Sequence, residues 1–109
     1  AFLAASKAGD LASLLSLLHP DAVLRADPVT VKMGAKALTR GAEAVAQTFA
    51  GRARFAELGT IDGEFGALWS AGGEIRVAFS FRIRDGLVAG IELLGDPTLL
   101  RDLNLARVN

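Results

Sequence analysis

Two aspartates are the side chains best placed to act as an acid or a base. Asp27 ends a short apolar segment, and Asp62 stands before a glycine between two alternating segments. A carboxyl group in an apolar pocket has a raised pKa and can serve as a general base. Asp27 also precedes a proline, however, and Asp-Gly is a strong hairpin signal, so a turn role is favoured over catalysis for both residues.

The other polar candidates are explained better by structure than by chemistry. His19 follows a helical pattern and precedes a proline, where a cation stabilises the helix end. Trp69 could stack on a ligand, but its apolar neighbours favour packing. Arg82 and Glu92 are expected on the solvent-facing side of two neighbouring strands, which predicts a cross-strand ion pair. The sequence does not bring a nucleophile, a base and an oxyanion donor together. An enzymatic function would therefore be supported only by the fact that other proteins with this kind of fold are enzymes.

Composition limits the remaining kinds of site. The 109 residues include no cysteine and one histidine, so thiolate chemistry and disulfides are excluded and no metal site or cofactor is expected. Lys plus Arg and Asp plus Glu number 12 each, so no net charge draws the chain to nucleic acid. No apolar stretch approaches the roughly 20 residues that cross a bilayer. The sequence therefore predicts a soluble, cytoplasmic protein with no membrane partner.

The first half of the chain has mostly helical periodicity. Residues 1–18 contain two helical patterns separated by Gly9-Asp10, which predicts a helical hairpin. A proline then ends the helix, and Ala22–Asp27 is predicted to be a short strand. Pro28–Leu38 is mixed in composition and contains glycine, so we expect an irregular segment. Gly41–Ala50 repeats helically and is predicted to be the third helix.

From Glu57 onward the periodicity changes to two, with glycine-containing turns between the alternating segments. This pattern predicts an antiparallel meander. In Glu74–Arg84 the apolar residues share one face, which we expect to be buried as far as Ile83. The residues expected to line a pocket under the helices are Trp69, Ile75, Val77, Phe79, Phe81 and Ile91. Helices followed by a curved antiparallel sheet indicate one α+β domain over residues 1–109.

The opposite face of the predicted sheet carries small residues among its charges. These residues are Ala78, Ser80, Val88, Gly90 and Leu94. Small side chains let a second sheet approach closely, which predicts a homodimer through this face. The same patch could instead face another part of a longer polypeptide, and the sequence leaves both alternatives open.

The stretch after the last alternating segment reads LGDPTLLRDL. Asp96 is a suitable helix N-cap, and Pro97 is a suitable first helical residue. Leu99 and Leu103 fall on one side of this short helix and are expected to close the domain's own core. Leu100 would then be free for an outward contact.

Several stretches together resemble the SnoaL-like domain of the nuclear-transport-factor-like superfamily, and the resemblance covers nearly the whole chain. More narrowly, they are similar to the version fused to the C-terminus of extracytoplasmic-function sigma factors, which is common in actinobacteria. The stretches are FLAASKAGDLASLLSLL, PDAVLRAD, RGAEAVAQTF and TIDGEFGALWSAGGEIRVAFSFRIRDGLVAGIELLGDPTLLRDL.

The resemblance implies a cone-like α+β barrel that packs against the promoter-binding core of a sigma factor and modulates its activity. In the best-described branch, a glycine-rich loop after the first strand's Asp and an Asn-Pro-Asp-Lys-Leu box carry this role. Here Asp27 is kept, but residues 28–30 replace the glycines. In the box, Pro97 and Leu100 match and Asp96 is a near match. These four residues are the expected regulatory contacts.

Three functions therefore stand beside one another. The first is a non-catalytic domain that contacts the sigma core regions of its own polypeptide and RNA polymerase; the start at Ala1 is consistent with excision from a longer sigma factor. The second is a stand-alone enzyme of the polyketide cyclase or ketosteroid isomerase kind, with Asp27 or Asp62 as base. The third is a sensor whose pocket binds a small apolar ligand.

Overall fold

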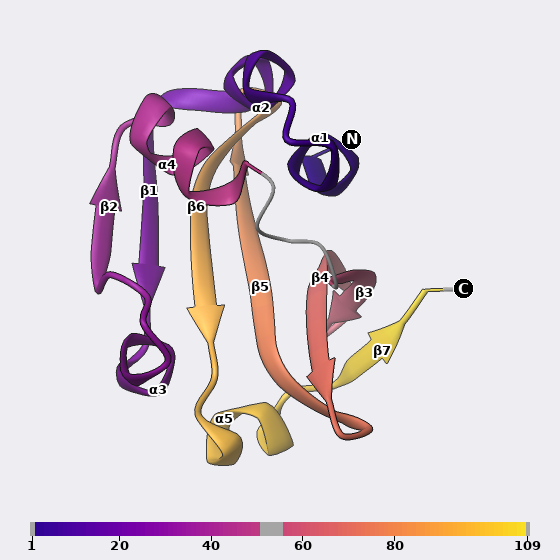
Figure 1. Ribbon diagram of the computed structural model, residues 1–109. Coiled ribbons are helices and arrows are strands. Elements are labelled where there is room, and N and C mark those ends of the chain that lie inside the picture. Colours follow the sequence, from indigo (N-terminus) through magenta and orange to yellow (C-terminus); the bar gives the residue numbers. More distant parts are fainter. Residues whose placement is uncertain (1, 51–55, 109) are drawn as a thin grey trace.

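The computed structural model describes residues 2–50 and 56–108, which form five helices and a sheet (Figure 1). The helices are α1 (Phe2–Ala8), α2 (Leu11–Leu17), α3 (Pro28–Lys32), α4 (Ala42–Phe49) and α5 (Pro97–Asp102). The strands are β1 (Leu18–Ala26), β2 (Leu38–Arg40), β3 (Glu57–Ile61), β4 (Glu64–Ala71), β5 (Glu74–Arg84), β6 (Leu87–Leu94) and β7 (Leu105–Arg107). None of the helices in these two ranges is long and apolar enough to span a membrane.

The seven strands form one curved, open sheet in the order β2-β1-β6-β5-β4-β3-β7. Hairpins join β3 to β4 and β5 to β6, at turns where Asp62 and Asp85 adopt φ values of 51° and 54°. β1 pairs in parallel with β6, so the sheet is mixed, whereas the sequence predicted an antiparallel one. Periodicity reports which face of a strand is buried, but it does not report the direction of a partner far along the chain.

The predicted helical hairpin is confirmed. α1 and α2 meet at Gly9, which has a φ of 69°, and the Asp10 side chain accepts a hydrogen bond from the Ser13 amide at 3.1 Å. β1 begins at Leu18, earlier than predicted, because it includes Pro20 in an irregular stretch before regular pairing with β6 resumes at Val23. Proline is tolerated in a strand at such an irregularity, since the ladder needs no N–H group there.

The segment Pro28–Leu38, predicted to be irregular, contains α3 and the first residue of β2. Pro28 is the first helical residue, and Asp27 caps the helix. A capping residue followed by proline is a helix-start signal in its own right. The prediction was wrong because the glycine and the mixed composition that follow outweighed that signal.

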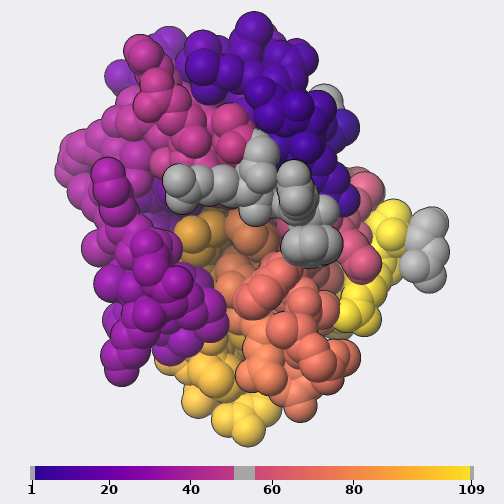
Figure 2. Space-filling view, viewed as in Figure 1, coloured from indigo at the N-terminus to yellow at the C-terminus, as the bar shows by residue number. Residues whose placement is uncertain are grey.

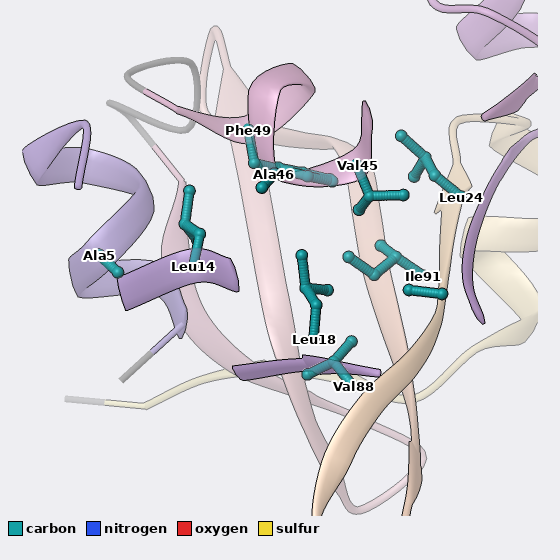
Figure 3. Packing of buried hydrophobic residues seen from close by; sticks show 10 residues of the cluster. Ala5, Leu14, Leu18, Leu24, Val45, Ala46, Phe49, Val88 and Ile91 are labelled. Atoms are coloured by element: carbon teal, nitrogen blue, oxygen red, sulfur yellow. The ribbon is translucent and has the colours of Figure 1, made fainter. Parts of the chain in front are cut away.

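The main core lies between the concave face of the sheet and the helices α1, α2 and α4. Figure 3 shows Val45 of α4 beside Ile91 of β6, with Leu18 next to Val88. The buried members of this core are Ala5, Leu14, Leu18, Ala22, Leu24, Val45, Ala46, Phe49, Val88 and Ile91. The third predicted helix is therefore confirmed as α4, which supplies Val45, Ala46 and Phe49.

A second apolar cluster lies on the convex face of the sheet. Ala78 and Leu94 are cross-strand partners, and alternation points them away from the face of Phe79 and Leu93. They pack with Leu100 of α5, so this short helix covers part of the convex face. The buried members of this second cluster are Ile61, Leu68, Ala78 and Leu100.

Two register shifts interrupt the pairing of β5 with its neighbouring strands. Near the β4–β5 hairpin, Trp69 pairs with Val77 but Ser70 pairs with Ile75, which leaves Arg76 as an extra residue. A bulge of this kind moves the residues beyond it to the other face, so Ile75 joins the second cluster instead of the concave pocket predicted for it. At the other end of β5, a second shift leaves Ala89 as an extra residue on β6, and beyond it Ile83 is 59% exposed instead of buried.

The residues from which a homodimer was predicted do not form one surface patch. Ala78 is fully buried and Leu94 packs in the second cluster, while Val88 belongs to the main core. Gly90 lies beneath the guanidinium group of Arg82. Most of this patch is therefore used within the chain itself.

The ion pair predicted between Arg82 and Glu92 does not form. Glu92 stands opposite Ser80, and Arg82 stands opposite Gly90. The salt bridges within the described part of the chain join Arg76 to Glu74 and Arg107 to Glu57.

Ser6 links α1 to the end of α4. Its side chain is fully buried, and its hydroxyl donates to the carbonyl oxygen of Phe49, at a helix end where carbonyl groups lack intrahelical partners. Ser6→Ala should lower the free energy of unfolding, measured by urea denaturation, by about 1–3 kcal/mol. Ser16→Ala is the matched control, because it removes an exposed hydroxyl that donates to Ser13. Equal losses in the two variants would contradict this role for Ser6.

Candidate functional site

Asp27 lies where the end of β1, the start of α3 and the β6–α5 turn meet. Its Oδ1 atom accepts hydrogen bonds from the Thr30 amide at 2.9 Å and from the Thr30 hydroxyl at 3.0 Å. Its Oδ2 atom accepts from the amides of Gly95 and Asp96 at 2.8 and 2.9 Å. Both carboxylate oxygens are therefore engaged, and together they join two segments that are distant in sequence.

These contacts set the protonation state of Asp27. Burial by itself would raise the pKa of Asp27, but the amides of Thr30, Gly95 and Asp96 outweigh burial and hold that pKa below its ordinary value. A carboxylate that is stabilised in its ionised form by several donors is a weak base. Asp27 is thus arranged as a structural clamp and not as a group that takes a proton from a substrate.

Asp62, the other candidate base, occupies the turn between β3 and β4. Its Oδ1 atom accepts from the Asn104 amide at 2.8 Å, and its own amide donates to the Asn104 carbonyl at 2.8 Å. The side chain is exposed at this Asp-Gly turn, as the turn interpretation predicted. The structure places Asp27 and Asp62 at different turns, each bound to backbone groups, and does not bring them together as an acid–base pair.

The LGDPTLLRDL stretch forms α5, and this helix starts at the predicted residues. Asp96 caps the helix by accepting from the Thr98 amide at 2.9 Å, and Pro97 is the first helical residue. The faces of this helix differ from the prediction, because α5 packs on the convex side of the sheet. Leu100, expected to point outward, is 9% exposed in the second cluster, whereas Leu99, expected to be buried, is 38% exposed.

A cavity of about 490 Å³ opens between α3, α5 and the start of β5, which we call the α3–α5 groove. Its apolar lining includes Val29 of α3 and the C-cap residue Met33, Ile75 of β5, and Pro97 and Leu100 of α5. Its charged lining residues are Glu74, Arg76 and Arg101. Figures 1 and 2 show α3 and α5 together at the lower end of the molecule. The groove is thus flanked by the two segments that Asp27 joins.

The aromatic pocket predicted on the concave face is filled by the protein's own side chains. The ring of Phe2 lies 5.4 Å from that of Phe81, and the ring of Phe49 lies 6.2 Å from that of Phe79. Ile91 is 1% exposed in the main core. These residues pack the helices against the sheet, as aromatic clusters commonly do.

Val77 and Trp69 were also predicted to line a pocket, but they pack within the sheet. Val77 is buried, and Trp69 is half-buried opposite it on β4. Neither lines the α3–α5 groove, whereas Ile75, which the bulge turns to the other face, does.

A second, more polar cavity of about 320 Å³ lies beside α4 on the concave side, and we call it the inner pocket. Leu24 and Leu93 provide apolar lining, and Lys36 lies in its wall. Thr39 also lines it, and its buried hydroxyl has no hydrogen-bond partner among residues 2–50 and 56–108. Sequence analysis missed Thr39, because a threonine in a strand pattern gives no signal that its hydroxyl lacks a partner.

The single histidine takes part in surface contacts. His19 Nδ1 accepts from the Asp21 amide at 3.1 Å, and its Nε2 lies 3.1 Å from an Arg84 guanidinium nitrogen. Within the described ranges, histidine and acidic side chains do not gather in any group of three or more that could hold a metal ion.

Comparison with solved structures identifies the fold. An extracytoplasmic function sigma factor, SigJ of Mycobacterium tuberculosis, matches with a TM-score of 0.69 and 24% identity, over 92% of this chain and 42% of that one. A protein of Sinorhizobium meliloti that is provisionally assigned as a polyketide cyclase matches with a TM-score of 0.59 and 24% identity, over 85% and 89% of the two chains. A SnoaL-like protein of unknown function from Burkholderia thailandensis matches with a TM-score of 0.59 and 17% identity, over 85% and 86%.

These similarities show that the chain has the SnoaL-like, NTF2-like fold, which confirms the predicted cone-like α+β architecture with a sheet that stays open. No family model and no curated protein sequence matches the chain. The chain spans 42% of the length of the sigma factor. Because the same fold occurs in a sigma factor and in a provisional cyclase, the fold is compatible with both a regulatory and an enzymatic function.

Replacing Asp27 tests the clamp. Asp27→Asn puts an amide NH₂ group where an oxygen now accepts from backbone N–H groups, so we expect the free energy of unfolding to fall by about 2 kcal/mol or more. Asp10→Asn is the control. Asp10 is an exposed helix cap whose pKa is also lowered, by hydrogen bonds from the side chain and amide of Ser13, and asparagine caps helices equally well. A smaller loss for Asp27→Asn than for Asp10→Asn would contradict the clamp.

The clamp also predicts a pH dependence. The pKa of Asp27 is lower in the folded chain than in the unfolded one, so its stabilising effect is present above the unfolded value and is lost as the pH falls through the folded value. The stability difference between the wild type and Asp27→Asn, measured by urea denaturation, should therefore shrink between about pH 7 and about pH 3. A difference that stays constant or grows on acidification would show that Asp27 is not held in its ionised form.

Proposed function

We propose that this chain is a regulatory domain of an extracytoplasmic-function sigma factor, and that it packs its α3–α5 groove against the sigma core regions of the same polypeptide. The observation that carries the proposal is the Asp27 clamp. The clamp joins the start of α3 to the turn before α5. That turn leads into Asp96, Pro97 and Leu100, the residues that resemble the Asn-Pro-Asp-Lys-Leu box. Similarity to a sigma factor over 92% of the chain supports the same function.

The chemistry of the groove suits a protein partner. Met33, the residue that caps the C-terminal end of α3, is 54% exposed, and Leu99 of α5 is 38% exposed. Exposed apolar residues with charged neighbours are typical of interaction surfaces. Arg76 and Arg101 would supply polar contacts at the rim. The expected occupant is therefore an apolar segment of the sigma core that carries acidic residues.

Other parts of the proposal follow from this assignment. The domain would act in the cytoplasm as the C-terminal part of a longer, actinobacterial chain, and the core regions would recognise the promoter. RNA polymerase would be contacted through the assembled sigma factor. Regulation by contact needs no catalytic group, and the engagement of Asp27 and Asp62 with backbone amides supports a non-catalytic function.

A second candidate function is the binding of a small molecule in the inner pocket. The unpaired hydroxyl of Thr39 favours it, and so does the similarity to a provisional polyketide cyclase. An enzyme that works through a general base would need a carboxylate or an imidazole in the pocket. The polar side chains that line the pocket are Lys36, Thr39, Gln47 and Thr48. Binding is therefore better supported than proton abstraction.

A charge placed in the groove tests docking in the full-length protein. Met33→Glu should change transcription by the reconstituted polymerase roughly fivefold or more, because an unpaired charge in an apolar contact is costly. Ile83→Glu is the matched control, since Ile83 is similarly exposed, at 59%, but lies at the other end of β5. It should leave transcription unchanged.

Melting temperatures of both variants must stay close to that of the wild type for the comparison to hold. Unchanged transcription in a folded Met33→Glu protein would contradict docking through the groove. A native reading frame that encodes no sigma core regions would contradict the proposal as a whole.

A further inference from the structure

Thr39 presents a buried polar group that none of the described residues satisfies. The residue is 9% exposed, and its Oγ1 atom has no hydrogen-bond partner in the described part of the chain. Thr39 stands opposite Leu24 on β1, so its side chain points to the same concave side as the core residue Leu24. Buried hydroxyl groups are nearly always paired in folded proteins, so an unpaired one in a pocket wall indicates a missing partner.

The inner pocket around Thr39 has the composition of a small-ligand site. Leu24 and Leu93 form apolar wall, and Gln47 and Thr48 line the side formed by α4. The Thr48 hydroxyl already donates to the Ala44 carbonyl at 2.9 Å, so it is left as an acceptor. The pocket volume of about 320 Å³ suits a small molecule with an apolar body and a few polar atoms.

The charge of the residues that line the inner pocket indicates which polar group the ligand carries. Lys36 is the charged residue among the described residues that line the pocket. It is exposed, and it forms no ion pair with the residues that the structure describes. Among the described residues, no acidic side chain lines the pocket. An ammonium group and a hydroxyl donor that line the same pocket, both without a partner among the described residues, favour an anionic acceptor, because charge-assisted hydrogen bonds are stronger than neutral ones.

We propose that the inner pocket binds a small organic carboxylate. The carboxylate accepts from the Thr39 hydroxyl and the Lys36 ammonium group, and the apolar body of the ligand packs on Leu24 and Leu93. This assignment names the ligand class for the second candidate function and rests on that function, not on docking of the α3–α5 groove. Its test can therefore fail while docking holds.

The position of α3 relates the pocket to the groove. Met33 lines the groove, and the next residues, Gly34 and Ala35, line the inner pocket. The Ala35 amide donates to the Thr30 carbonyl at 3.1 Å, which ties this wall to α3. Met33 is the only methionine of the chain, so a labelled methionine methyl group gives one signal that reports on the groove side of this wall.

The test is an NMR titration of the ¹⁵N-labelled chain, with ¹³C-methyl methionine, against butyrate, 4-methylpentanoate and benzoate. The matched neutral probes are the three corresponding amides. At least one carboxylate should give saturable shifts at the amides of Lys36 and Thr39 and at the Met33 methyl group. Its amide should bind about tenfold more weakly or worse, because it cannot form the charge-assisted contact.

Two variants remove the two proposed contacts. Thr39→Val keeps the shape of the side chain and should weaken carboxylate binding about tenfold, while the melting temperature of the ligand-free protein rises because an unpaired hydroxyl is lost. Lys36→Gln changes an exposed residue and should also weaken binding about tenfold. Lys32→Gln is the matched control, since Lys32 is exposed on α3 but does not line the pocket. It should bind as the wild type does.

Three results would overturn the assignment: no saturable shift with any of the three carboxylates, equal binding of carboxylates and amides, or unchanged binding in Lys36→Gln. A lower melting temperature for ligand-free Thr39→Val would also overturn it, because the hydroxyl would then have a structural partner. None of these results bears on transcription by Met33→Glu, so failure of this assignment and failure of groove docking are separate outcomes.

Discussion

The carboxylate of Asp27 holds together two parts of the chain that are 68 positions apart in sequence. One carboxylate oxygen accepts a hydrogen bond from the start of α3, and the other accepts one from the turn before α5. Parallel pairing of β1 with β6 brings the carboxylate there, because Ala26 stands opposite Leu93 and the Asp27 amide donates to the Leu93 carbonyl at 3.0 Å. A local cap thus becomes a long-range link, and the α3–α5 groove depends on it.

The two faces of the sheet are covered by different elements. The concave face is packed by three helices and by phenylalanines of α1, α4 and β5, and the smaller inner pocket lies near Thr39. The convex face is covered in part by α5, which buries Leu100 and Ala78. α3 and the loop that follows it stand between the inner pocket and the α3–α5 groove. A ligand in one cavity and a protein segment in the other would therefore share one wall.

The sequence predicted local structure well and long-range structure poorly. Periodicity and capping residues located the helical hairpin, the strands β3 to β6 and the start of α5 at Asp96, because these depend on neighbours a few positions away. The short strand β7 was not predicted. The parallel β1–β6 pair and the bulge that turns Ile75 to the convex face depend on partners far along the chain. For Asp27, the sequence predicted a turn role but not its partners Gly95 and Asp96. Thr39 gave no signal, because a missing partner is visible only in three dimensions.

Backbone hydrogen exchange tests the central claim most directly, by comparing this chain alone with the full-length protein. If the groove packs against the sigma core, the amides of residues 29–34 and 98–101 should exchange more slowly in the full-length protein. The end of β5 around Ile83 should exchange equally in both, since it lies away from the groove. Equal exchange of α3 and α5 in the two proteins, or protection only around Ile83, would contradict docking through the groove.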